Sequence, residues 1–149
     1  MRAIKATTSL LLALILAAGL IGFAGTTESS AASRGANITL HVFECYQGVG
    51  GGNAIFNECH DWDNNALDGY SFKVAGAVRD TDWGYVTWRP GAGTHTIVGY
   101  NIDLYAGAYV FCSNQVTGAV LYDGSADWDA VTITTTANQE VICDWYYIA

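Results

Sequence analysis

The sequence predicts an all-β protein: a single antiparallel β-sandwich of about seven strands, stabilised by disulfides and preceded by an N-terminal signal peptide. Three observations predict this fold class. Short stretches rich in β-branched and aromatic residues recur between turn signals, about every eight to twelve residues. No long stretch with helical periodicity separates them. The four cysteines follow an export signal, and cysteines of exported chains usually pair as disulfides.

The N-terminal segment, residues 1–32, has the composition of a secretory signal peptide. It begins with basic residues, continues through an apolar run from Leu10 to Ala24, and ends at Ala32 in a small-residue cleavage site. Cleavage there would leave one domain, residues 33–149, long enough to bury a core. An uncleaved anchor is the alternative, although the run is shorter than the about 20 residues of a membrane span. We therefore expect a secreted or cell-surface protein that is soluble after signal cleavage.

The domain that follows the signal segment is acidic. The whole chain has a net charge of −8, and removal of Arg2, Lys5 and Glu28 takes it to −9. Phosphate groups bind through cations, so this charge disfavours nucleic acid and anionic membrane surfaces as partners. An extracellular protein or a polysaccharide remains the expected kind of partner, and the sequence does not indicate an oligomeric state.

The spacing of the four cysteines favours two particular disulfides. Cys45–Cys59 would close a local loop, and Cys112–Cys143 would join neighbouring strands. Each would stabilise the fold by roughly 3–4 kcal/mol on the loop-entropy model. A zinc site built from Cys45, Cys59, His60 and a later cysteine is the alternative, but the chain lacks the C-x-x-C pair typical of such sites.

The first strand of the domain is expected at Ala36 to Cys45. Its residues alternate between two faces that are both partly apolar, and His41 on one of them is expected to pack or to lie at a rim rather than to act as a ligand. A long loop at 46–68 follows, tied down by the Cys45–Cys59 disulfide. Its glycine-rich start resists regular structure, whereas Ala54-Ile55-Phe56 is interpreted as a short helical turn or a buried plug.

The middle of the domain reads as a series of short strands separated by turns. Further strands are expected at Tyr70–Val78, Tyr85–Trp88, Thr94–Tyr100, Tyr105–Ser113, Ala119–Tyr122 and Val131–Thr135.

The closing strand, Gln139 to Ala149, is the segment around which we expect the sheet to be organised. Alternation places four residues on one face (Val141, Cys143, Trp145 and Tyr147) and four on the other (Ile142, Asp144, Tyr146 and Ile148). The expected partner is Tyr105–Ser113, in which Ala108, Val110 and Cys112 share a face.

Three stretches resemble prealbumin-like (transthyretin-like) sandwich domains of bacterial surface proteins, the group that includes collagen-adhesin B-type and pilin repeats. They are Gly69–Val74 followed by Thr81–Trp88, the turn into a strand at Pro90–Ile97, and the closing Val141–Tyr147. The resemblance implies a prealbumin-like or immunoglobulin-like sandwich that acts as a structural or adhesive module. Many such domains carry a lysine–asparagine isopeptide bond between the first and last strands. This chain lacks that lysine and that asparagine, so the disulfides are expected to provide the covalent reinforcement.

The acidic segment after Cys59 is the first candidate binding site. Asp61, Asp63, Asn65 and Asp68 offer oxygen atoms at the spacing of a short calcium loop. The segment lacks the glycine and the glutamate of a complete EF-hand, and Asp and Asn also dominate ordinary turns. Calcium binding and a plain turn both remain open, and no other cofactor is expected.

Tryptophans beside aspartates form the second candidate site. Trp62, Trp83 and Trp128 lie in or next to loops, where exposed indole rings could stack on sugars, whereas Trp88 and Trp145 are assigned to the core. A calcium- or carbohydrate-binding module is therefore the alternative to a structural one. No nucleophile elbow or zinc-protease motif occurs, so an enzyme is not predicted; a hydrolase using carboxylates such as Asp127 and Asp129 is the residual alternative.

Overall fold

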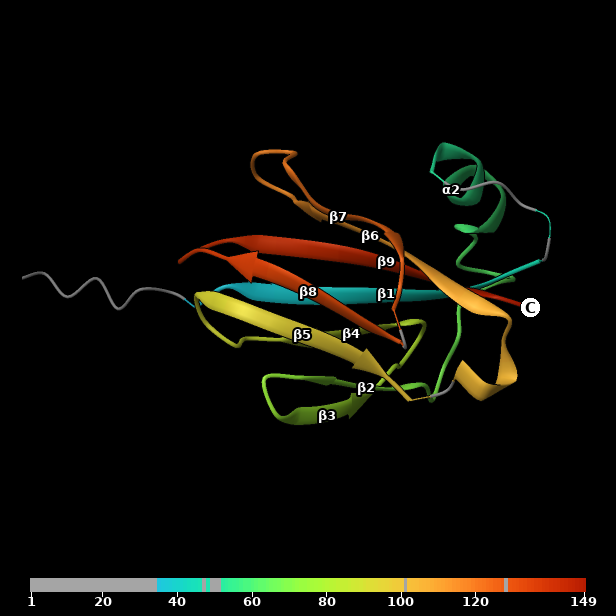
Figure 1. Cartoon of the computed structure of the whole chain (residues 1–149), viewed down its shortest axis with the longest axis horizontal. Helices are drawn as coiled ribbons and strands as arrows, with labels where there is room; N and C mark the ends of the chain where they lie inside the picture. Colours follow the sequence, from blue (N-terminus) through green and yellow to red (C-terminus); the bar gives the residue numbers. More distant parts are fainter. Residues whose placement is uncertain (1–34, 47, 49–51, 101, 128) are drawn as a thin grey trace, which may run out of the picture. The chain divides into compact units, whose positions relative to one another are not determined.

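The computed structural model describes residues 35–46, 48, 52–100, 102–127 and 129–149. The predicted signal peptide, Val49-Gly50-Gly51 of the glycine-rich segment and Trp128 lie outside the described residues. The described part contains nine strands, one α-helix and one short 3-10 helix. Its strands form two sheets that pack around a shared hydrophobic core, which confirms the all-β sandwich (Figure 1).

The larger sheet has five strands in the order β4-β1-β9-β6-β7, and the smaller has four in the order β3-β2-β5-β8. The larger sheet consists of β4 (Tyr85–Trp88), β1 (Asn37–Cys45), β9 (Glu140–Ile148), β6 (Gly107–Asn114) and β7 (Val120–Ser125). The smaller consists of β3 (Ala77–Asp80), β2 (Ser71–Val74), β5 (Gly93–Gly99) and β8 (Ala130–Thr135). The helices are α2 (Asn53–Cys59) and η1 (Ile102–Leu104). Neither helix of this described part is long and apolar enough to cross a bilayer.

Two features differ from the expected antiparallel sandwich of about seven strands. The stretch Tyr70–Val78 is two strands rather than one, because Ala75 and Gly76 take positive φ angles of 48° and 85° and turn the chain back. The pairing of β1 with β9 is parallel, over nine residues from Asn37 opposite Glu140 to Cys45 opposite Ile148. Figure 1 shows these two strands side by side and pointing the same way. The first and last strands are therefore neighbours in the middle of the larger sheet.

The closing strand contributes the largest side chains of the core. Its inner face carries Val141, Cys143, Trp145 and Tyr147, all fully buried or nearly so, as the alternation predicts. Trp145 packs against Phe72 of the smaller sheet with ring centroids 5.2 Å apart, and Trp88 is also buried. Aromatic burial of this kind is the main hydrophobic contribution to such a core.

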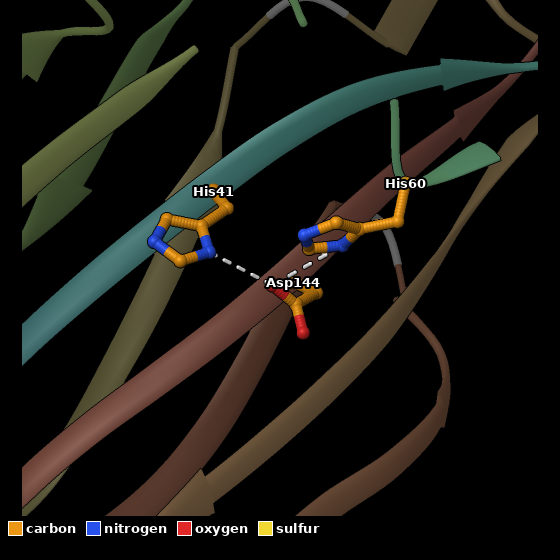
Figure 2. A group of neighbouring side chains, drawn as sticks. All are labelled: His41, His60 and Asp144. Carbon is orange, nitrogen blue, oxygen red and sulfur yellow. Dashed lines mark hydrogen bonds and ion pairs between the residues drawn. The ribbon is translucent and has the colours of Figure 1, made fainter. Parts of the chain in front are cut away.

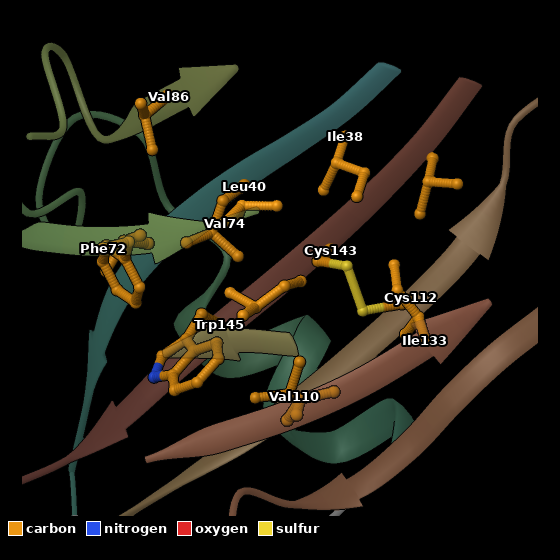
Figure 3. Packing of buried hydrophobic residues seen from close by; sticks show 14 of the residues in the cluster. Ile38, Leu40, Phe72, Val74, Val86, Val110, Cys112, Ile133, Cys143 and Trp145 are labelled. Atoms are coloured by element: carbon orange, nitrogen blue, oxygen red, sulfur yellow. A yellow bond between two sulfur atoms is a disulfide. The ribbon is translucent and has the colours of Figure 1, made fainter. Parts of the chain in front are cut away.

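The predicted disulfides are both confirmed. Cys112 of β6 and Cys143 of β9 lie directly opposite each other in the antiparallel ladder and are joined within the core (Figure 3). Cys45 at the end of β1 is joined to Cys59 at the end of α2. Because both cysteines of the second pair are oxidised to each other, neither is free to bind zinc in the way the alternative interpretation required.

The described part of the loop at 46–68 packs onto the outer face of the larger sheet. A second hydrophobic cluster forms there from Phe43, Cys45, Ile55, Cys59 and Tyr146. Ile55 and Cys59 are the buried residues of α2, while Phe56 is half exposed, so the expected helical turn is present and anchors the loop through two side chains. The Cys45–Cys59 disulfide and this cluster together fix the loop over β1 and β9.

Candidate functional site

The candidate site lies at the edge of this second cluster, on the outer face of β1 and β9. His41 of β1 stands opposite Asp144 of β9 in the parallel register. The imidazole Nδ1 of His41 is 3.0 Å from the carboxylate Oδ1 of Asp144, a hydrogen-bond distance. Parallel pairing in register therefore brings together two residues separated by 103 positions in the chain.

His60 completes the group from the loop. It follows α2 directly, so the neighbouring Cys59 disulfide places it over the same face of the sheet. Its Nδ1 is 3.9 Å from Asp144 Oδ1 and 3.0 Å from the hydroxyl of Tyr146. Figure 2 shows both imidazole rings turned toward the Asp144 carboxylate.

The electrostatics of the group keep His60 neutral and Tyr146 protonated. Burial lowers the pKa of His60; the Asp144 charge opposes this shift and His41 adds to it. Burial, and then the charge of Asp144, raise the pKa of the Tyr146 hydroxyl far above its ordinary value. The Tyr146 hydroxyl therefore keeps its proton and can donate to His60 Nδ1 or accept from an Nδ1–H, according to the tautomer of the imidazole.

Aromatic rings surround the two histidines. The Trp62 ring lies edge-on to His41 at 4.8 Å and to Phe43 at 4.9 Å. Phe43 and Phe56 approach the His60 ring to 4.3 and 4.6 Å. The side chains of the three polar residues remain 12–18% exposed, so the group is shielded on the protein side but open to solvent on the other.

These three residues are the group of metal-type ligands that the described residues contain. Their donor atoms all lie within 4.8 Å of one another. Two imidazole nitrogens and one carboxylate oxygen suit zinc and copper, whereas calcium and magnesium prefer sites built from oxygen alone.

Three of the four residues of the predicted calcium loop use their side chains in hydrogen bonds within the protein, and Asp63 contributes its backbone N–H. Asp61 accepts bonds from the backbone N–H groups of Asp63 and Asn64 and from the Asn64 side chain, the pattern of an Asx turn. Its pKa is lowered by these bonds, with the Asn64 side chain first. Asn65 donates to the Cys59 carbonyl, and Asp68 accepts from the backbone of Gly84. Calcium binding by these residues stays a prediction.

The tryptophans of the second candidate site can be placed in part. Trp62 and Trp83 are 44% and 77% exposed, as expected for loop positions, and Trp128 lies outside the described residues. Trp62 packs beside Gly84, since a Cβ built on that glycine would lie 3.5 Å from the indole. One edge of the Trp62 indole therefore packs against the protein and is not free to stack on a sugar. Sugar binding by these rings stays a prediction.

Sequence reasoning missed His41, His60 and Asp144 as a group. The alternation of β1 and β9 already placed His41 and Asp144 on the outer faces of their strands. The predicted Cys45–Cys59 disulfide would also have brought His60 to the face that carries Cys45 and His41, because residues 41 and 45 share a face. The missing element was the parallel pairing of the two strands, which no local pattern encodes.

No family model and no curated protein matches the chain. Solved structures of the major pilin of Streptococcus pyogenes are similar to it. Two mutant forms have TM-scores of 0.42 and 0.41 with 9% and 10% identity, and another structure of the pilin has a TM-score of 0.37 with 9% identity. Each match covers 77% of this chain and 48% of the pilin, so the chain spans about half the length of these proteins. We infer the function from the chain's own residues.

Proposed function

We propose that the protein is an exported structural or adhesive module of a cell surface or extracellular assembly, and that it resists tension applied between the two ends of its domain. The observation that carries the proposal is the parallel pairing of β1 with β9. The chain enters the pair at Asn37 and leaves it at Ile148, at opposite ends of the two strands. Tension between these points pulls the strands in opposite directions along their own axes.

This geometry loads the hydrogen bonds of the ladder together rather than one after another. β1 is bonded along one edge to β9, over nine residue pairs, and along the other to β4, over four. Backbone bonds just beyond the register extend the contact, from Asn37 N–H to the Gln139 carbonyl and from Ala149 N–H to the Cys45 carbonyl, both 2.8 Å. Sliding either strand requires these bonds to break in one step, which raises the barrier to forced unfolding.

The disulfides add covalent limits to this arrangement. Of the 111 residue steps between Asn37 and Ile148, 14 lie within the Cys45–Cys59 loop and 31 within the Cys112–Cys143 loop, which leaves 66 free to extend. At about 3.6 Å per residue, and with about 30 Å already spanned by the folded strands, unfolding should release about 210 Å. The chain would remain cross-linked even when the sandwich has opened.

Single-molecule force measurements test the proposal. The domain would be pulled through its two ends, and separately through the β2–β3 turn at Gly76 and the C-terminal end, so that the second geometry peels the edge of the smaller sheet. We expect the unfolding force to be higher in the first geometry, and we expect reduction of the disulfides to lengthen the released chain to about 370 Å. Equal forces in both geometries would contradict the tension-bearing role. The extracellular protein or polysaccharide to which such a module would attach is inferred from the sequence only.

A further inference from the structure

We propose that His41, His60 and Asp144 bind a divalent transition metal of the zinc class, a site that goes beyond the structural role above. The group supplies two imidazoles and one carboxylate, and the 12–18% exposure of these side chains gives water access to a fourth position. Three protein ligands and one exchangeable position make an open zinc site. In such a site the ion would join the loop to the sheet at a second point besides the disulfide.

The spacing of the donor atoms is close to what zinc requires. With metal–ligand distances of about 2.0–2.1 Å, two ligands of a tetrahedral site lie about 3.3 Å apart. Asp144 Oδ1 is 3.0 Å from His41 Nδ1, slightly less than that distance, and 3.9 Å from Nδ1 of the His60 ring, whose other nitrogen would bind the ion. No two of the three donor atoms are more than 4.8 Å apart, so the group would have to contract slightly around the ion.

The protonation of the group is compatible with metal binding. A ligand imidazole must be neutral, so the ion competes with protons for both histidines. Figure 2 shows the second nitrogen of His60 on the side of the ring that faces His41. A metal bound there leaves Nδ1–H to donate to the Tyr146 hydroxyl, the kind of support that metal-bound imidazoles receive from neighbouring polar groups. At His41 the ion takes the place of the proton shared with Asp144, and the ring carries its proton on the other nitrogen.

The scaffold holds the ligands before any ion arrives. His41 and Asp144 are fixed by the register of two central strands, and His60 is fixed by the disulfide of the adjacent Cys59. Ligands that are already ordered lose little entropy on binding, and a site with three protein ligands needs this to reach a high metal affinity. The acidic charge of the domain also favours the approach of cations.

Titration with Zn²⁺ and Co²⁺ tests the site on the exported protein, purified without an affinity tag. We expect one Zn²⁺ per chain with a dissociation constant below about 10 μM. Co²⁺ is expected to give the visible absorption of four-coordinate cobalt with nitrogen and oxygen ligands. His41→Gln, His60→Gln and Asp144→Asn should each weaken Zn²⁺ binding at least about tenfold. The sequence contains three histidines, so His95→Ala is the matched control and should bind as the wild type does.

A measurement on the unaltered protein keeps the test decisive if a variant does not fold. The ring-nitrogen resonances of His41 and His60 should shift on addition of Zn²⁺, while those of His95, which contacts the Gly91 carbonyl at 3.0 Å on the smaller sheet, should not. The proposal is overturned if the wild type binds no Zn²⁺ in this range, or if His95→Ala lowers affinity as much as His41→Gln does. Equal affinity of the folded Asp144→Asn variant would overturn it as well.

Discussion

His41 and Asp144 face each other across the parallel β1–β9 ladder, with imidazole and carboxylate 3.0 Å apart. A shift of this pairing by one residue would turn one of the two side chains toward the core, so the contact reports the register directly. The same two strands are the ones proposed to resist tension, and they supply two of the three ligands of the proposed metal site. The two proposals can therefore be tested separately on one structural element.

The neutral state of His60 makes stability depend on pH. Burial lowers its pKa in the folded protein, so the unfolded chain, with a pKa near the ordinary 6.5, binds more protons below that value. The His60 contribution to stability is therefore present above pH 6.5 and is lost as the pH falls through and below it. We expect the free energy of unfolding, measured by urea denaturation without metal, to decrease from pH 7.5 to 5.5.

The His60→Gln variant is the control for this pH dependence. Glutamine can still meet the Tyr146 hydroxyl but does not titrate, so the variant should lose less stability over the same interval. His41 and Asp144 are retained in the variant, so the comparison isolates the His60 side chain. A pH dependence as steep in His60→Gln as in the wild type would show that another group is responsible.

The two disulfides should contribute unequally to stability. On the loop-entropy model, the 31-residue separation of Cys112–Cys143 is worth about 3.7 kcal/mol and the 14-residue separation of Cys45–Cys59 about 3.0 kcal/mol. Replacement of the first pair by alanine also leaves space in the main core, since both cysteines are fully buried. Urea denaturation should therefore find the Cys112→Ala/Cys143→Ala double variant less stable than Cys45→Ala/Cys59→Ala. The reverse order would contradict this account.

The parts of the fold that could be predicted are those that local patterns encode. Alternation along residues 139–149 assigned both faces of β9, and cysteine spacing assigned both disulfides. The β2–β3 hairpin was missed because its turn contains Ala75 at positive φ and no Asn-Gly or Asp-Gly signal. The parallel β1–β9 pair was missed because it joins segments about a hundred residues apart, and with it the His41–Asp144–His60 group.

Gly99 should tolerate no side chain. A Cβ at this position would lie 2.7 Å from the Tyr147 hydroxyl and 3.1 Å from the Phe72 ring, and both of those side chains are fully buried. Gly99→Ala should therefore lower the free energy of unfolding by about 1–3 kcal/mol, the usual cost of overpacking. Gly107→Ala is the matched control, because a Cβ there meets nothing within 4 Å, and its stability should equal or exceed that of the wild type. Equal effects at the two positions would contradict the prediction.

Calcium and zinc should be distinguishable by the residues they need. Asp61 and Asp68 already accept hydrogen bonds from backbone N–H groups, which favours the turn alternative for the acidic loop. We expect millimolar Ca²⁺ to leave the melting temperature and tryptophan fluorescence unchanged. A rise in melting temperature that disappears in Asp63→Asn would instead support the calcium alternative.

The Cys45–Cys59 disulfide should control metal affinity as well as stability. It fixes the loop that supplies His60, whereas Cys112–Cys143 lies on the inner side of the sheet, opposite the face that carries the three proposed ligand side chains. Removing the first disulfide makes the ordering of His60 part of the cost of binding, so Cys45→Ala/Cys59→Ala should bind Zn²⁺ several-fold more weakly than wild type. The folded Cys112→Ala/Cys143→Ala variant should bind with wild-type affinity despite its larger loss of stability. Affinities that follow overall stability, rather than the attachment of His60, would show that the loop is held by its hydrophobic cluster alone.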